Sequence, residues 1–191
     1  MWTDTPLKVD FALKGEPNHL ELYGGPYTLS APAAPTMFVR KQTHRQALWT
    51  TQLNFQPTSN RTEAGTTVYW NYLTYSSIGI RLVGQQRSIR WRPAEGEECI
   101  LPLRTSENDV FLAIDCQPMS YRFGYVEMGQ DRSDSQDLTR AINWIGEVST
   151  AVMTQDPKVG AAFSGMTLGL YAFGDMERCL VPAVFKFAEF S

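Results

Sequence analysis

The sequence is poor in the residues that usually carry catalysis. It has only two histidines and three cysteines among 191 residues. His19 and His44 are too few to form a catalytic zinc site without carboxylates, and neither lies near a serine or cysteine in a nucleophile motif. Cys99, Cys116 and Cys179 are too widely spaced for a metal cluster. The sequence therefore predicts no catalytic residue of these kinds and no metal site.

Three further features that the sequence lacks limit the kinds of partner that the protein can bind. No apolar run reaches the length of a membrane span, and the first residues lack the charged and apolar regions of a signal peptide. The net charge is -3, so no basic field would attract nucleic acid or anionic lipid. We expect neither a membrane nor a nucleic-acid partner, and a chain that stays inside the cell or is an internal piece of a longer protein.

The cysteines allow two interpretations. Cys116 ends the apolar stretch at 110–116, and the preferred interpretation is a buried free thiol. The alternative is a Cys99–Cys116 disulfide between neighbouring strands, which would need an oxidising compartment.

Short apolar and aromatic runs fill the rest of the chain. In the stretch 165–170, Met166, Leu168 and Leu170 alternate with small residues, which predicts a strand with one buried face. Near the end, Phe185, Phe187 and Phe190 mark a second such strand, with a slip in the alternation past Ala188. Strands are expected at 20–23, 36–40, 48–55, 64–72, 77–83, 88–92, 99–103, 110–115, 120–126, 163–174 and 182–190.

These runs predict an all-β fold. One short helix is expected within 135–143, and residues 24–36 form a proline-rich loop. Many short strands separated by turns are typical of a jelly-roll β-sandwich of two antiparallel sheets. We expect residues 1–191 to form a single β-sandwich domain.

Carboxylates are candidate catalytic groups, because a glycosidase needs two of them facing each other across a groove. Asp115 and Glu127 each end an expected strand, and Glu63 is a further candidate by residue type. The remaining candidates, Glu95, Glu97 and Glu98, lie between prolines, where a solvated acidic turn is expected.

Aromatic residues are the better candidates for binding sugars. In the expected strand 64–72, alternation places Trp70 and Tyr72 on one face and Asn71 on the other, so that an outward face would offer a ring beside an amide. Trp91, between two arginines, is a further candidate. The competing interpretation is that Trp70 and Trp91 belong to the core.

The order of several segments resembles the C-terminal β-sandwich module of family-43 glycoside hydrolases, the β-xylosidase and α-arabinofuranosidase group. The resemblance covers nearly the whole chain. Its segments are LELYGGPYTLS (20–30), APTMFVRKQTH (34–44), FSGMTLGLYAFG (163–174) and PAVFKF (182–187), with further matches at 53–57, 63–70, 77–80 and 144–150.

The resemblance implies a concanavalin A-like fold and a catalytic five-bladed propeller on a separate domain, in cis or in trans. Arg40, Gln42 and His44 match a segment that in many members leads toward the substrate pocket. Val184 and Lys186 stand where relatives often carry acidic residues, so we expect no cofactor, with a structural calcium as the alternative. The location would be extracellular if a secreted hydrolase carries this module.

Three functions follow as hypotheses. The first is a non-catalytic accessory or carbohydrate-binding module of a hydrolase acting on xylan- or arabinan-type hemicellulose, which by itself is not an enzyme. The second is a small jelly-roll glycosidase or lyase that uses its own acidic residues. The third is a protein-docking module, which would expose a large apolar patch.

Overall fold

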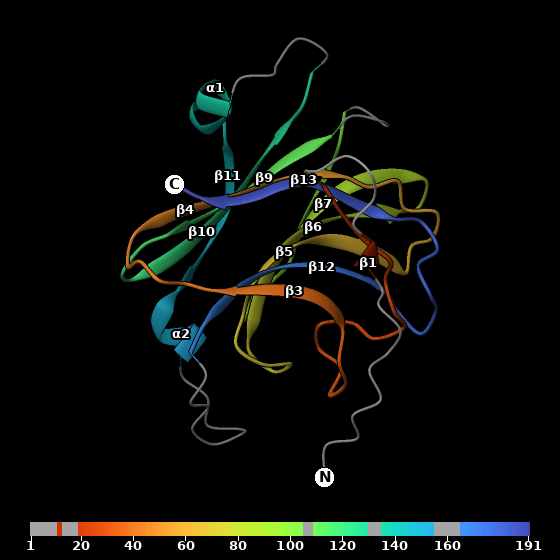
Figure 1. Cartoon of the computed structure of the whole chain (residues 1–191), viewed down its shortest axis with the longest axis horizontal. Helices are drawn as coiled ribbons and strands as arrows, with labels where there is room; N and C mark the ends of the chain where they lie inside the picture. Colours follow the sequence, from red (N-terminus) through yellow and green to blue (C-terminus); the bar gives the residue numbers. More distant parts are fainter. Residues whose placement is uncertain (1–10, 13–18, 105–108, 130–134, 155–164) are drawn as a thin grey trace.

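A computed structural model of the chain describes residues 11–12, 19–104, 109–129, 135–154 and 165–191. These residues form two antiparallel sheets, which confirms the predicted all-β sandwich (Figure 1). The seven-stranded sheet has the order β1 (Phe11–Ala12), β2 (Leu20–Leu22), β13 (Ala183–Phe190), β4 (Ala47–Asn54), β9 (Val110–Cys116), β10 (Ser120–Glu127) and β11 (Asn143–Ser149). The six-stranded sheet has the order β3 (Thr36–Lys41), β12 (Thr167–Gly174), β5 (Thr62–Tyr69), β6 (Tyr75–Val83), β7 (Gln86–Arg92) and β8 (Cys99–Pro102).

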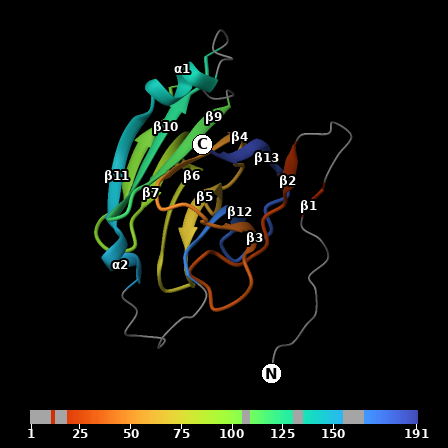
Figure 2. The same ribbon diagram turned by 60° about the vertical axis from the view of Figure 1, so that its left-hand side comes forward.

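Two short helices flank β11, namely α1 (Ser135–Arg140) before it and α2 (Thr150–Thr154) after it. Figure 2 shows β11 and β1 on opposite sides of the sandwich, as the strand order of their sheet requires. None of the described helices has the length and apolar character needed to cross a bilayer.

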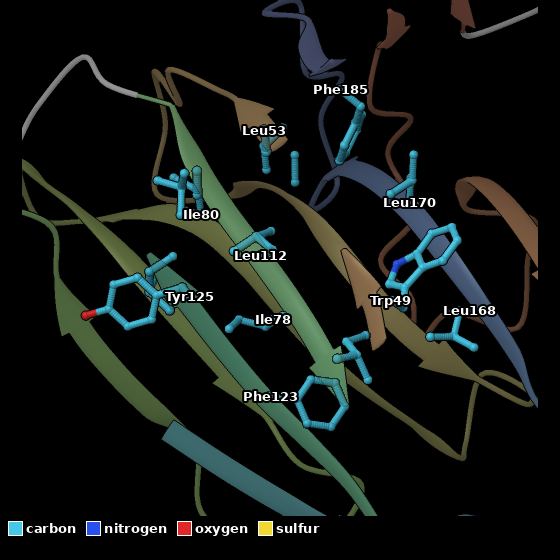
Figure 3. Close-up of a cluster of buried hydrophobic side chains, with 14 of the residues drawn as sticks. Trp49, Leu53, Ile78, Ile80, Leu112, Phe123, Tyr125, Leu168, Leu170 and Phe185 are labelled. Atoms are coloured by element: carbon cyan, nitrogen blue, oxygen red, sulfur yellow. The ribbon is translucent and has the colours of Figure 1, made fainter. Parts of the chain in front are cut away.

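The core lies between the two sheets because period-two alternation gives each strand one apolar face. Leu168 and Leu170 of β12 are buried in the core, as the alternation predicts. Figure 3 shows them with Trp49 and Phe185, which come from the opposite sheet. The indole of Trp49 also donates a buried hydrogen bond of 2.8 Å to the hydroxyl of Thr66 across the two sheets.

The slip in the last strand occurs at a different residue from the predicted one. Phe185 pairs with Leu53 and Phe187 pairs with Gln52, so Lys186 is the extra residue of a β-bulge. The bulge turns Phe187 to the outer face of the seven-stranded sheet, where it packs near Phe111. The prediction of a slip past Ala188 was therefore wrong.

The expected strand 64–72 ends earlier, at Tyr69. Asn71 causes this, because its side-chain oxygen accepts hydrogen bonds from the backbone N–H groups of Leu73 (2.8 Å) and Thr74 (2.9 Å). Such an Asx turn replaces the strand alternation. Trp70 and Tyr72 consequently lie in the β5–β6 turn, and not on a strand face as predicted.

Strand β11 and helix α2 were not predicted from the sequence. The pairing of β10 with β11 shifts register between Phe123 and Gly124, and Gly146 interrupts the apolar pattern of β11. Both features remove the regular alternation on which the prediction relied. The predicted helix within 135–143 is present but shorter.

The three cysteines are free. Cys99 lies on β8 and Cys116 on β9, which belong to different sheets, so the alternative of a disulfide between neighbouring strands was wrong. Cys116 is fully buried, and burial raises the pKa of its thiol to about 12, which keeps it protonated and unreactive.

The proline-rich loop covers part of the outer face of the six-stranded sheet. Leu29 from this loop packs with Tyr75, Tyr171 and Phe173, which all point outward from that sheet. Gly24 allows the loop to come close, since a Cβ there would lie 2.7 Å from the backbone of Phe173. The loop thus occupies sheet surface that would otherwise face solvent.

The inner face of β11 yields a test of the packing. A Cβ on Gly146 would lie 2.2 Å from the ring of Trp91, which must then shift. We expect Gly146→Ala to lower the free energy of unfolding by about 1–3 kcal/mol, measured by urea denaturation. Gly129→Ala is the control, because a Cβ at Gly129 meets nothing within 4 Å. Equal stability of the two variants would contradict this packing.

Candidate functional site

Several predicted site residues gather at one end of the sandwich. Lys41 pairs with Thr167, and Thr167 pairs with Tyr69, so β3, β12 and β5 share this end. The β3–β4 loop (42–46) follows Lys41, and the β5–β6 turn (70–74) follows Tyr69. Gln42, His44, Trp70 and Tyr72 therefore lie at the same end, which we call the loop end.

The seven-stranded sheet supports the loop end through Tyr121. Its hydroxyl donates a hydrogen bond of 3.0 Å to the side-chain oxygen of Gln42. The Gln42 amide group in turn donates to the backbone oxygen of His44 at 2.7 Å. Burial raises the pKa of Tyr121 to about 12, so its hydroxyl stays protonated and remains a donor. The β3–β4 loop is thus tied to both sheets, with the exposed His44 ring beside the hydroxyl of Thr43.

Arg40 and Trp91 are placed differently from this group. The Arg40 guanidinium lies 5.1 Å from the ring centre of Phe190, at the open side between β3 and β13. Trp91 is half-buried and points into the sandwich, where its ring lies 6.3 Å from that of Phe123.

Trp70 and Trp91 each contain one buried polar atom without a hydrogen-bond partner among the described residues. The buried indole N–H groups of Trp70 and Trp91 have no acceptor within the part of the chain that the structure describes. Trp70 belongs to the loop end, whereas the Trp91 ring packs against Gly146 and Phe123. Of the two, Trp70 is therefore the better placed to meet a ligand.

Asp115 and Glu127, the two candidate acids that end expected strands, lie too far apart for the paired carboxylates of a glycosidase. Asp115 pairs with Arg122 and Glu127 pairs with Val110, so the two carboxylates lie at opposite ends of the β9–β10 ladder. Five residues of strand separate these positions by about 17 Å, whereas glycosidase carboxylates lie about 5–9.5 Å apart.

Both carboxylates also have structural partners. The Asp115 carboxylate accepts hydrogen bonds from the guanidinium of Arg122, with a donor–acceptor distance of 3.0 Å from Nε. Glu127 accepts a hydrogen bond of 2.7 Å from the backbone N–H of Arg104. The three acids of the β7–β8 turn are exposed, as predicted for a solvated turn.

A buried network around Glu63 was missed by the sequence analysis. Glu63 is 1% exposed and faces outward from β5. Its carboxylate accepts hydrogen bonds from Tyr171 (2.7 Å) and from Arg90 (2.8 Å). Arg81, opposite Glu63 on β6, lies at 3.7 Å. The signal in the sequence was the alternation itself, which places Glu63 and these arginines on one face of adjacent strands.

The charges of this network stabilise each other. Although burial lowers the pKa of Arg90, the carboxylates of Glu63 and Glu98 more than compensate and raise it above its ordinary value. Burial and the nearby Glu63 carboxylate raise the pKa of Tyr171 well above its usual range. The Glu63 carboxylate therefore accepts hydrogen bonds from two fixed donors and is buried away from any ligand.

A second charged cluster lies on the outer face of the seven-stranded sheet. Lys186, in the bulge of β13, forms an ion pair with Asp109, whose carboxylate also accepts hydrogen bonds from the amides of Gln52 and Asn54. An ammonium group therefore already neutralises this carboxylate. No group of three or more potential metal ligands (His, Cys, Asp or Glu) occurs among the described residues.

The Glu63 network predicts a large loss of stability when its acid is removed. Glu63→Ala leaves the largely buried Arg90 with only Glu98 as a charged partner, and we expect the free energy of unfolding to fall by about 3 kcal/mol. Urea denaturation followed by fluorescence measures this. The exposed Glu97→Gln is the matched control, and we expect it to change stability by less than about 0.5 kcal/mol. A neutral effect of Glu63→Ala would contradict the network.

The contacts of the Asp109 carboxylate predict a contribution to folding stability that is lost in acid. Burial alone would raise its pKa, but hydrogen bonds from Lys186 and two amides outweigh this and bring the pKa below its ordinary value. A lowered pKa contributes stability that is complete above about pH 4 and is lost as the pH falls through the folded-state value. Asp109→Asn should therefore lose less stability than the wild type between pH 4 and about pH 2. An unchanged pH profile, equal to that of the exposed Asp175→Asn, would refute this.

Solved structures with a similar fold include a Bacteroides ovatus protein named xyloglucan PUL GH43B, with a TM-score of 0.80 and 22% identity over 95% of this chain. A xylan beta-1,4-xylosidase from Bacillus halodurans C-125 has a TM-score of 0.77 and 17% identity, also over 95% of this chain. This chain spans 34% of the length of each, and identities this low show a shared fold alone.

A Saccharomyces cerevisiae protein of unknown function is also similar, with a TM-score of 0.63 and 8% identity; the match covers 94% of this chain and 91% of that one. No curated protein matches the sequence significantly. A family model described as the beta xylosidase C-terminal concanavalin A-like domain matches residues 1–191. The chain belongs to this family, the C-terminal concanavalin A-like domain of family-43 β-xylosidases.

Proposed function

We propose that this chain is a non-catalytic accessory module of a family-43 glycoside hydrolase that acts on xylan- or arabinan-type hemicellulose. In this proposal the catalytic carboxylates belong to a propeller domain, which the module stabilises and whose substrate entrance it shapes. The observation that carries the proposal is that the candidate acids are held in hydrogen bonds and ion pairs with neighbouring side chains. Glu63 lies between Tyr171 and Arg90, and Asp115 pairs with Arg122, so neither offers a carboxylate to a substrate.

The β3–β4 loop is the part of the module that we assign to the substrate entrance. Gln42 is fixed by Tyr121, and its amide holds the backbone of His44 in place. The His44 imidazole is exposed and can exchange hydrogen bonds with sugar hydroxyls. A tethered loop with an exposed polar ring loses little conformational entropy when it meets a ligand.

Deletion tests the accessory role. The complete open reading frame that encodes this chain should yield a polypeptide that hydrolyses an aryl xyloside or arabinofuranoside. Removing residues 1–191 should lower its melting temperature and its activity, and His44→Ala in the complete polypeptide should raise KM more than it lowers kcat. A reading frame without a hydrolase domain, or a deletion that changes neither stability nor activity, would overturn the proposal.

A separate titration tests carbohydrate binding. Xylo- and arabino-oligosaccharides are added to the purified chain, and heat and tryptophan fluorescence are recorded. Binding at the loop end should be weakened about 5- to 30-fold by Tyr72→Ala, because an aromatic platform supplies roughly 1–2 kcal/mol. Tyr27→Ala is the control, since Tyr27 is an exposed tyrosine in the proline-rich loop, whereas Tyr72 is partly buried at the loop end. If no sugar binds, the module has only the structural role.

A further inference from the structure

The first third of the chain carries positive charge without acidic residues. Between Glu21 and Glu63 the sequence contains four Lys or Arg residues and no Asp or Glu, although the whole chain has a net charge of -3. Three of the four, Arg40, Lys41 and Arg45, lie within six residues at the β3–β4 loop, and all three are exposed. The β3–β4 loop is therefore a positively charged patch on an acidic protein.

Two of these cations have no charged partner. Neither Lys41 nor Arg45 forms an ion pair among the residues that the structure describes. By contrast, Arg90 and Lys186 on the outer faces of the two sheets each pair with a carboxylate. The charge of Lys41 and Arg45 is thus available to an anionic ligand.

The backbone that carries the two cations is held in place. The Gln42 side chain accepts a hydrogen bond from the Tyr121 hydroxyl and donates one to the backbone oxygen of His44. Gln42 directly follows Lys41, and His44 directly precedes Arg45. Both cationic side chains therefore leave a tethered loop, which reduces the conformational entropy lost when a ligand binds.

The cations are also aligned with the aromatic residues of the loop end. Lys41 pairs with Thr167, and Thr167 pairs with Tyr69, so the three residues form one row across β3, β12 and β5. The spacing of strands in a sheet places Lys41 about 10 Å from Tyr69, where the turn with Trp70 and Tyr72 begins. The buried indole N–H of Trp70 has no acceptor among the described residues. A short oligosaccharide spans the distance between the cations and this turn.

We propose that Lys41 and Arg45 bind the carboxylate of an acidic saccharide, whose neighbouring sugar rings lie against the β5–β6 turn. This inference rests on the proposed function and deepens it, because it names uronic-acid-bearing chains as the ligand. Ammonium and guanidinium groups form charge-assisted hydrogen bonds with carboxylates, which are about twice as strong as hydrogen bonds between neutral groups. A glucuronic acid branch of xylan and a galacturonic acid of pectin offer the same carboxylate, so the experiment compares both.

Calorimetric titration of the purified chain tests the carboxylate site. The ligands are xylotriose, xylotriose that carries one glucuronic acid, and trigalacturonate. We expect the glucuronic acid to tighten binding about 10-fold or more at low salt, because hydrogen bonds to charged groups are the strong ones. This gain should shrink at about 0.5 M salt, where exposed charges are screened. Trigalacturonate that binds more tightly than the substituted xylotriose would support the carboxylate site and contradict xylan as its source.

Charge-matched variants locate the site. The double variant with Lys41→Gln and Arg45→Gln should reduce the preference for the acidic xylotriose to less than about 2-fold, because both charged donors are lost. The control with Arg61→Gln and Arg178→Gln removes the same charge from exposed arginines at the opposite ends of β5 and β12, and it should keep the preference. The comparison of ligands on the wild type stands by itself should either variant fail to fold.

Each contrary outcome has a distinct meaning. Equal affinity of the wild type for xylotriose and for its glucuronic acid derivative overturns the carboxylate site and leaves the proposed function intact. A preference that survives in the variant with Lys41→Gln and Arg45→Gln overturns the assignment to these two residues. If the wild type binds none of the three saccharides, this inference fails, while the accessory role is decided separately by the deletion from the complete polypeptide.

Discussion

The structure depends on the separation of inner and outer faces that the two-residue period of its strands imposes. Inner faces carry the aliphatic and aromatic side chains that hold the sheets together, and the hydrogen bond from Trp49 to Thr66 satisfies a polar atom within that apolar layer. Burying this layer supplies most of the stability. The charged clusters around Glu63 and Asp109 consequently lie on the outer faces of the two sheets.

This confinement explains why the candidate acids of the described part of the chain are paired with cations and hydrogen-bond donors. On the outer face of the six-stranded sheet, a buried carboxylate needs compensation, and Glu63 obtains it from Tyr171 and Arg90. On the other sheet, Asp109 is compensated by Lys186, and Asp115 by Arg122. Such pairs fix the outer surfaces of the sheets and the register of their strands.

Much of the fold could be predicted from the sequence, because alternation reports directly which face is buried. Leu168 and Leu170 lie where their pattern places them. The failures occur where other interactions override the period: Asn71 ends β5 with a side-chain turn, and Lys186 adds a residue to β13. The loop end was harder to predict, since Gln42 meets Tyr121 only after two sheets have packed. The exposure of Phe38 depends on strand order, which local patterns do not encode.

The most direct test of the account is the catalytic competence of the purified chain alone. It would be incubated at high concentration with aryl xylosides, aryl arabinofuranosides and the corresponding oligosaccharides, and product release would be followed over hours. The account predicts release no faster than in buffer, because Asp115 and Glu127 lie at opposite ends of their strand pair. Turnover that disappears on Asp115→Asn or Glu127→Gln would contradict it.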